Sequence, residues 1–245
     1  MPTARESLLD AAQTALARIP WSGVRMVDVA LAAGLSRQTL YNEFGSKDGL
    51  ARALVRREAD TYLHGVDRVL ERTAGPLDTV VALAEWTVGE ARARPLLHAL
   101  LTGCWGERLP VPRPVRTGAV PAVSPAQRRA DAGLPGPAEV VALVRDRSLA
   151  ALLPRGRWGT ATVTPCAGPG GLADRCELAL RLALSCVVAP APDGVGALVR
   201  RAVGAAEGSR SPGLPVPEES RSAGFPVPEG SRSASPPAQW AEPDS

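Results

Sequence analysis

The chain has 245 residues, with 28 lysines and arginines against 25 aspartates and glutamates, which gives a formal net charge of +3. This length allows one or two domains, and the small positive excess suits an anionic partner such as DNA without demonstrating one. No apolar run reaches the ~20 residues of a membrane-spanning helix, and the start of the chain shows charges every few positions instead of a secretory signal, so we expect a cytoplasmic protein.

The first helix is predicted over residues 5–19. Its apolar side chains recur at the spacing of one helix face. Thr3 and Glu6 have the spacing of a capping box, which indicates where the helix begins. Pro20 cannot continue a helix and predicts its end.

Three further helices follow in quick succession. A short helix over 27–33 ends at Gly34, a residue that tolerates the left-handed backbone found after helices. Ser36 offers an N-cap oxygen for a third helix over 37–44. A Gly-Ser pair then repeats the same stop and cap, and a long helix with a broad apolar stripe runs over 47–72.

The remainder of the chain is also predicted to be helical, separated by proline-rich connections. Seven prolines mark 106–137 as a long connection, and a glycine- and proline-rich loop covers 154–171. No segment of useful length alternates with the period of a strand. We therefore predict an all-α fold. The later helices are expected over 77–93, 96–105, 138–153, 172–188 and 194–206.

Residues 208–245 differ in composition from everything before them. A Ser-Arg-Ser triplet recurs every 11 residues, and the segment holds eight prolines with little apolar bulk. Such a segment cannot bury enough surface to offset the entropy of ordering. We predict a disordered tail, which serves either as a docking or phosphorylation segment or as a tolerated extension.

The candidate functional site is the helix-turn-helix pattern at residues 24–50. In this plan the second short helix enters the major groove of DNA and presents its N-terminal side chains to base edges. Helical spacing from Leu40 places Phe44 on the buried side. Gln38 and Asn42 fall near the opposite face, with Thr39 and Tyr41 on its flanks. Arg37 lies closer to the buried side, but it is in the first turn and has a long reach, so the exposed set is Arg37, Gln38, Thr39, Tyr41 and Asn42. These side chains suit base edges or phosphates, and Lys47 at the next helix N-terminus suits a phosphate.

The segments 7–16, 24–33 and 34–50 resemble the N-terminal DNA-binding domain of the TetR family of bacterial transcriptional regulators. The most specific part is the pattern L-Y-x-x-F-G-S-K-x-x-L over residues 40–50. The resemblance implies an all-helical homodimer, with a DNA-binding domain over 1–46 and a ligand-binding and dimerisation domain over 47–207. Such proteins are usually repressors that a small-molecule effector releases from a palindromic operator.

The resemblance assigns roles residue by residue. The residues it places on DNA are Arg25, Ser36, Arg37, Gln38, Thr39, Tyr41, Asn42 and Lys47. Two positions depart from the family pattern. Glu43 stands where the family commonly has a histidine, and we expect it to pair with a cation such as Lys47 or Arg37, or to point aside. Arg25 stands where a threonine often caps the second helix, so it can replace a phosphate contact but not the cap.

Beyond residue 60 the resemblance supplies architecture only. The most continuously apolar late helices, 138–153 and 172–188, are the candidates for a four-helix dimer interface. An effector pocket would lie among the fourth to seventh helices. Its candidate liners are Trp86, His98, Leu101 and Trp105. Ordinary core packing is the alternative interpretation for each of them.

Other classes of function are less well supported. The four cysteines form no C-x-x-C pair and the histidines His64 and His98 are isolated, so we expect no metal, no cofactor and no enzymatic centre. A helical adaptor with a proline-rich docking tail would leave the polar face of 37–42 unexplained. A DNA-binding activator or an effector-independent regulator stays open, because the sequence does not distinguish these from a repressor.

Overall fold

The structure is a computed structural model that describes residues 2–73, 75–113, 134–152 and 171–208. The chain divides into two compact units, residues 1–210 and 211–245. The second unit, and with it the predicted tail, lies outside the described residues. In the described residues the first unit is entirely helical, as the sequence predicted.

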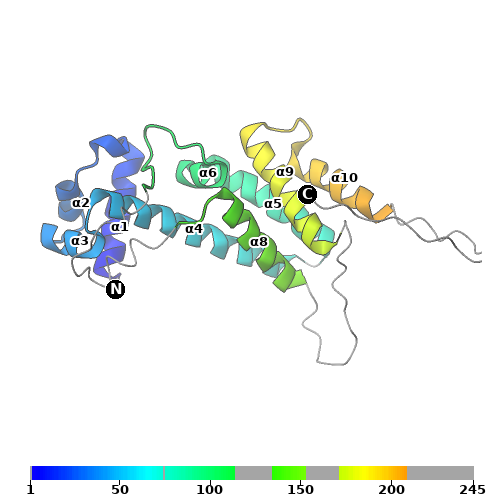
Figure 1. The fold of residues 1–245 in the computed structure, drawn as a ribbon, viewed down its shortest axis with the longest axis horizontal. Helices are drawn as coiled ribbons and strands as arrows, with labels where there is room; N and C mark the ends of the chain where they lie inside the picture. The colour runs from blue at the N-terminus through cyan, green and yellow to red at the C-terminus, as the bar shows by residue number, and fades with distance from the viewer. Residues whose placement is uncertain (1, 74, 114–133, 153–170, 209–245) are drawn as a thin grey trace, which may run out of the picture. The chain divides into compact units, whose positions relative to one another are not determined.

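Four helices and one short 3₁₀ turn make up the N-terminal part (Figure 1). They are α1 (Ala4–Arg18), the turn η1 (Trp21–Gly23), α2 (Met26–Ala32), α3 (Arg37–Phe44) and α4 (Lys47–Arg72). Helix α1 begins as predicted, because Thr3 Oγ1 accepts a hydrogen bond from the backbone N–H of Glu6 (3.2 Å). Its inner face buries Leu8, Leu9 and Ala12 against the helices that follow.

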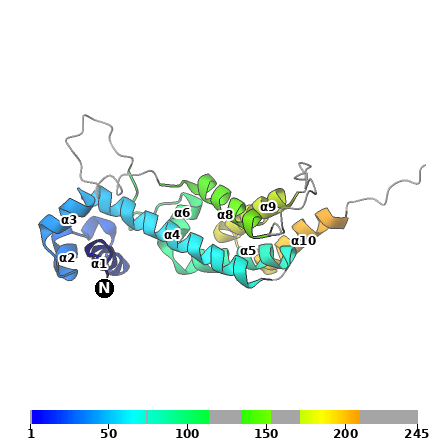
Figure 2. The ribbon, with the colours of Figure 1, turned by 90° about the horizontal axis from the view of Figure 1, so that it is seen from below.

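Helix α4 links the first three helices to the rest of the unit (Figures 1 and 2). Its N-terminal half packs against α1 and α3, and the helix also packs against α5, α6 and α8. Such a long contact needs apolar residues along the whole length, and they are present from Leu50 to Leu70. One glycine is required at its start, because a Cβ at Gly49 would overlap the carbonyl oxygen of Phe44.

The remaining helices form one apolar core with the second half of α4. They are α5 (Pro76–Ala93), α6 (Pro95–Thr102), α8 (Pro137–Leu152), α9 (Leu172–Val188) and α10 (Gly194–Gly208). Helix α5 packs against α9 and α10, and α8 packs against α9. Pro76 and Pro95 occupy the first helical turn, where a missing N–H costs nothing.

One predicted boundary is wrong. The sixth helix was predicted to run to Trp105, but α6 ends at Thr102. The reason is Gly103, which adopts a left-handed conformation (φ 73°) and donates its N–H to the carbonyl of Ala99 (2.8 Å). Glycine is the residue that takes this backbone at little cost, so it ends the helix.

Several expectations fall outside the described residues, namely most of the connection 106–137, most of the loop 154–171 and the tail. In the described ranges, no helix is long and apolar enough to cross a bilayer. Cys104, Cys176 and Cys186 are free thiols, and burial raises the pKa of Cys176 to about 11. The same ranges contain no cluster of three or more side chains suited to a metal ion.

Candidate nucleic-acid interface

The turn between α2 and α3 is built from backbone contacts and one serine. Gly34 has a positive φ of 67°, and the Leu35 N–H donates to the carbonyl of Ala30 (2.9 Å). Ser36 then caps α3, since its Oγ accepts a hydrogen bond from the Thr39 N–H (3.0 Å). The serine and threonine hydroxyls also lie 2.8 Å apart, which holds both side chains at the start of the helix. The N-terminus of α3 is therefore fixed in direction relative to α2.

Helix α3 has one buried face and one exposed face. Leu40 is fully buried and Phe44 is 2% exposed, so these two side chains anchor the helix to α1 and α4. Gln38 and Asn42 on the opposite face are exposed, as are Arg37 in the first turn and Tyr41, and Thr39 is half-buried beside the cap. The division agrees with the prediction from helical spacing.

Two of the exposed side chains of α3 are hydrogen-bonded to each other. Gln38 Nε2 donates to Asn42 Oδ1 (2.8 Å), one helical turn apart. The Arg37 guanidinium has no hydrogen-bond or ion-pair partner among the residues that the structure describes. An arginine at the first turn of a groove-binding helix can donate two parallel hydrogen bonds to a guanine edge. The geometry thus leaves Arg37 available for a base.

Lys47 lies at the N-terminus of the next helix, where Ser46 Oγ caps α4 by accepting from the Gly49 N–H (3.1 Å). Its Nζ donates to the carbonyl of Ser22 (3.3 Å) and lies 5.2 Å from the centre of the Trp21 ring. Partial burial lowers the pKa of Lys47, an effect that the charge of Asp48 opposes. Two of the three ammonium protons remain for a phosphate.

Arg25 occupies the N-cap position of α2 and makes no side-chain capping bond, as predicted from the absence of a threonine there. Its guanidinium instead forms two hydrogen bonds to Asp28, at 2.7 and 3.1 Å. Both side chains are largely exposed, at 73% and 50%. A pair this exposed contributes little to stability, so Arg25 can exchange Asp28 for a phosphate at small cost.

Glu43 pairs with a cation, as expected, but the cation is neither of the two named as examples. Its carboxylate lies 3.6 Å from Arg5 in α1, rather than beside Lys47 or Arg37. The Arg5 guanidinium also donates to the backbone carbonyl of Glu43 (3.4 Å) and lies 4.7 Å above the centre of the Phe44 ring. Arg5 shares a helix face with buried Leu8 and Leu9, which places it on the inner side of α1 but does not identify its partner. A bridge from α1 thus offsets the negative charge at the end of α3.

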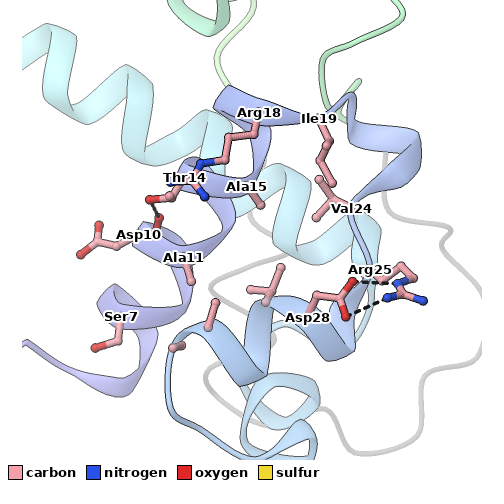
Figure 3. A pocket seen from close by; sticks show the side chains of 13 residues that line it. Ser7, Asp10, Ala11, Thr14, Ala15, Arg18, Ile19, Val24, Arg25 and Asp28 are labelled. Carbon is pink, nitrogen blue, oxygen red and sulfur yellow. Dashed lines mark hydrogen bonds and ion pairs between the residues drawn. The ribbon is translucent and has the colours of Figure 1, made fainter.

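A hollow of about 630 Å³ lies between α1 and α2, next to Arg25 (Figure 3). Its floor is formed by small side chains, among them Ala11 and Ala15 of α1. Asp10 and Asp28 stand at its sides in the view of Figure 3, and Arg25 carries the two dashed bonds to Asp28. Sequence reasoning did not anticipate this hollow, since it arises from how alanine faces of two helices meet.

The four predicted effector-pocket residues do not gather around one described cavity. Trp86 stacks on Tyr62, with 5.4 Å between ring centroids and 13° between ring planes. Leu101 is buried, whereas His98 and Trp105 are half-buried. None of the four lines the hollow between α1 and α2, the hollow between α4 and α8, or the cavity bordered by Leu16 and Leu96. Their assignment as effector ligands stays a prediction.

The N-terminal part of the chain is similar in sequence to known proteins. Residues 8–54 match the model of the bacterial regulatory proteins of the tetR family. A curated relative, the HTH-type transcriptional regulator AlkX of Mycobacterium tuberculosis (strain ATCC 25618 / H37Rv), is 41% identical over 100 residues. That alignment covers 40% of this chain and 47% of the relative, so the match spans about half the length of that relative.

Two solved structures align with more of the chain at lower identity. The TetR family repressor AlkX from Dietzia sp. strain DQ12-45-1b, implicated in biodegradation of n-alkanes, aligns with 19% identity and a TM-score of 0.46. The alignment covers 83% of this chain and 96% of that structure. A TetR transcriptional regulator from Rhodococcus sp. RHA1 aligns with 22% identity and a TM-score of 0.42, over 85% and 98% of the two chains.

Proposed function

We propose that this chain, whose residues 8–54 belong to the tetR family of bacterial regulatory proteins, is a sequence-specific DNA-binding regulator that represses transcription. The observation that carries the proposal is the division of α3 into two faces. Leu40 and Phe44 hold the helix by its back, and Arg37, Gln38 and Asn42 face outward from it. The relative that matches over 100 residues is named as a transcriptional regulator, which supports the same function.

The proposed binding mode divides the contacts by chemistry. Arg37 and Gln38 meet base edges in the major groove, because a guanidinium and an amide can each form paired hydrogen bonds there. Lys47 and Arg25 contact phosphates on either side of the groove, which fixes the position of α3 without reading sequence. Ser36, Thr39, Tyr41 and Asn42 complete the surface.

We expect the active form to be a homodimer that binds a palindromic operator. Helices α8 and α9 pack side by side, and each leaves an apolar side chain partly exposed, Leu143 at 37% and Leu178 at 40%. A second copy that packs α8 and α9 against the same pair would bury these side chains in a four-helix interface. Leu178→Glu should then shift the chain to monomer in light scattering and weaken operator binding.

The test of DNA recognition uses full-length protein and the DNA that flanks its own gene. Footprinting locates the site, and fluorescence anisotropy at several salt concentrations measures affinity. Arg37→Ala should weaken the specific site by about 1–3 kcal/mol and relax base preference. Arg72→Ala, at the far end of α4 and also exposed, is the matched control and should bind like the parent.

Lys47→Ala should act differently from Arg37→Ala. Loss of one phosphate contact weakens binding to all sequences alike and reduces the slope of log affinity against log salt by about one. If both variants kept the parental footprint and salt slope, the assignment of α3 and Lys47 to DNA would be wrong. Repression is checked with a reporter under the footprinted promoter, where deletion of the regulator should raise expression.

Release by a small molecule is the remaining part of the proposal. It predicts that an effector lowers operator affinity without unfolding the protein, as a ligand does when it favours a conformation that fits DNA less well. The four candidate liners of the sequence analysis, Trp86, His98, Leu101 and Trp105, form the first set to substitute. An effector that released the operator equally from all four alanine variants would exclude them as its contacts.

A further inference from the structure

Large apolar side chains project from the outer face of α2 and from the end of α1. Leu31 of α2 is 79% exposed, which is the highest value for a large apolar side chain in the described ranges. Val27, one helical turn before it, and Ile19 at the end of α1 are also exposed. One exposed apolar residue is ordinary, but a projecting leucine with apolar neighbours is typical of a surface that another molecule covers.

The hollow between α1 and α2 adjoins this leucine. Asp28 and Ala32, three residues before and one residue after Leu31, both line the hollow. Small side chains form its floor, among them Ala11 and Ala15 of α1 (Figure 3). Its volume of about 630 Å³ is larger than any single side chain, so it can accept the outer turn of a helix. One face of the domain thus presents a projecting leucine beside a depression with an apolar floor.

The charged groups at the rim of the hollow balance in sign. They are the carboxylates of Asp10 and Asp28 and the guanidiniums of Arg18 and Arg25. Asp10 pairs with Arg57 and Asp28 with Arg25, whereas Arg18 is exposed and has no hydrogen-bond or ion-pair partner in the described part of the chain. A rim that carries both signs does not suit a nucleic acid, and it complements a surface with the same mixture of charges.

We propose that the hollow is a self-association site that accepts the Leu31 turn of a second copy of this chain. A two-fold axis makes the contact reciprocal, because Leu31 of each copy enters the hollow of the other. Asp28 lies one turn before Leu31, so it reaches the rim of the facing hollow, where the partner's Arg18 donates to it. The cation that has no partner within one copy thereby gains one in the other.

This self-association and DNA binding favour one another, a step that rests on the proposed function. Arg25 holds Asp28 through two hydrogen bonds, at 2.7 and 3.1 Å, and in the proposed binding mode it exchanges them for a phosphate. The Asp28 carboxylate is then left without its arginine, and the partner's Arg18 takes that place. Because coupling between two binding events is reciprocal, DNA strengthens the contact and the contact strengthens DNA binding.

The contact is separate from the α8–α9 interface of the proposed dimer. It uses only α1, α2 and the few side chains around the hollow, which lie in the DNA-binding part of the chain (Figure 1). An interface this small is typical of weak or transient complexes, which bury less than about 1,200 Å². It becomes effective where DNA holds two copies side by side at an effective concentration in the millimolar range. We therefore expect dimers on neighbouring operators to bind cooperatively.

The first experiment needs no DNA. Sedimentation velocity of the full-length protein, from micromolar to about millimolar concentration, measures self-association. We expect the parent to form species larger than its dilute-solution form. Leu31→Glu should weaken this association at least about tenfold, since it places an unpaired carboxylate in the apolar hollow. Val111→Glu makes the same change at another exposed apolar position, away from the hollow, and should associate like the parent.

A charge exchange tests the pairing of Arg18 with Asp28. Arg18→Asp places two carboxylates opposite each other and should weaken association about fivefold or more, because the pair occurs twice in a two-fold interface. Adding Asp28→Arg to Arg18→Asp restores opposite signs and should recover most of the loss. All these side chains are exposed, so the variants should keep the parental melting temperature. A double variant as weak as Arg18→Asp would refute the pairing.

The second experiment compares DNA that carries one footprinted site with DNA that carries two, spaced by whole helical turns. The parent should fill the two sites with a cooperativity of about 5–150-fold, the usual size of such couplings. Leu31→Glu should bind the single site like the parent and lose the cooperativity. A general defect in folding would instead weaken the single site as well.

The outcomes for the surface and for the regulator are distinguishable. No self-association up to about millimolar protein, or association that Leu31→Glu leaves unchanged, would overturn the proposal and leave this apolar surface to a different partner. Self-association of a protein that binds no DNA would contradict the proposed function and retain the site. Self-association without cooperativity on two sites would retain the site and remove its link to operators.

Discussion

The contact between Trp86 and Gly65 offers the sharpest test of the packing between α4 and α5. The Trp86 ring stacks on Tyr62 and occupies the space that a Cβ at residue 65 would need. Replacing Gly65 by alanine therefore drives a methyl group into the ring. Gly89 on α5 is the matched control, because no atom lies within 4 Å of the position of its Cβ.

The two substitutions are expected to change the free energy of unfolding in opposite directions. Alanine favours a helix over glycine by about 0.8–1 kcal/mol, and this gain is common to both positions. At residue 65 the overlap costs about 1–3 kcal/mol. Displacement of the Trp86 ring from Tyr62 costs about a further 0.5–1.5 kcal/mol. We expect Gly89→Ala to raise the free energy of unfolding by about 0.5–1 kcal/mol. Gly65→Ala should lower it by roughly 0.5–3.7 kcal/mol, because the two costs exceed the gain in helix propensity.

Urea denaturation followed by circular dichroism measures both changes, and tryptophan fluorescence reports whether the ring has moved. Circular dichroism also confirms that each variant keeps its helix content. If Gly65→Ala stabilised the protein as much as Gly89→Ala, the Trp86 ring would not lie against residue 65. The stacked pair that forms this part of the core would then be wrong.

Three further predictions address a buried hydroxyl, a helix cap and a surface carboxylate. Tyr62→Phe removes a buried hydrogen bond to Thr87 (3.0 Å) and should lower the free energy of unfolding by about 1–3 kcal/mol in urea; an unchanged midpoint would contradict it. Ser36→Ala removes the N-cap bond of α3 and should cost about 0.5–2 kcal/mol, seen as faster amide exchange within that helix. The pKa of Glu177 is lowered chiefly by its hydrogen bond from Arg181, so its contribution to stability is present above the ordinary value of 4.5 and is lost as pH falls through the lowered value. Carboxyl NMR should show this depression shrinking in high salt, and a pKa at or above the ordinary value would refute the pairing.

The bounds of α3 were predictable because their causes are local. Ser36 caps the helix through the backbone of Thr39, three residues away, and Gly45 follows directly after its last residue. Leu40 and Phe44 lie one turn apart on the buried face. Each signal sits within one or two helical turns of the structure it determines, so reading the sequence along the chain is enough.

The partner of Glu43 was not predictable by the same means. Arg5 is 38 residues away along the chain and reaches Glu43 only because α1 packs against α3. Lys47 is nearer in sequence, but its ammonium is turned toward Ser22 and the Trp21 ring. Pairing between charges on different helices depends on how those helices are oriented, and helical periodicity contains no such information.

For Glu58, the burial was predictable from the sequence but the partner was not. It lies four residues after Leu54 and four before Tyr62, both of which are buried, so helical spacing already places its carboxylate on the buried face. That a carboxylate stands within an apolar stripe was therefore visible in the sequence. What it meets there was not, because its partner Arg94 (2.9 Å) comes from the junction of α5 and α6.

The cationic side chains of the N-terminal helices differ in how many partners they already have within the protein. This difference limits which of them can read DNA bases. Arg5 forms an ion pair with Glu43 and lies over the Phe44 ring. Lys47 donates one hydrogen bond to the carbonyl of Ser22. Arg25 is held by Asp28 in a pair so exposed that a phosphate can replace the aspartate. Arg37 is exposed in the first turn of α3 and has no polar partner within the described part of the chain. A guanidinium that must first break an ion pair within the protein gains less free energy from binding a base than a guanidinium with no such pair. Arg5 thus helps to hold α3 in place, and if α3 enters the major groove as proposed, we expect base discrimination to depend mainly on Arg37 and the Gln38–Asn42 pair.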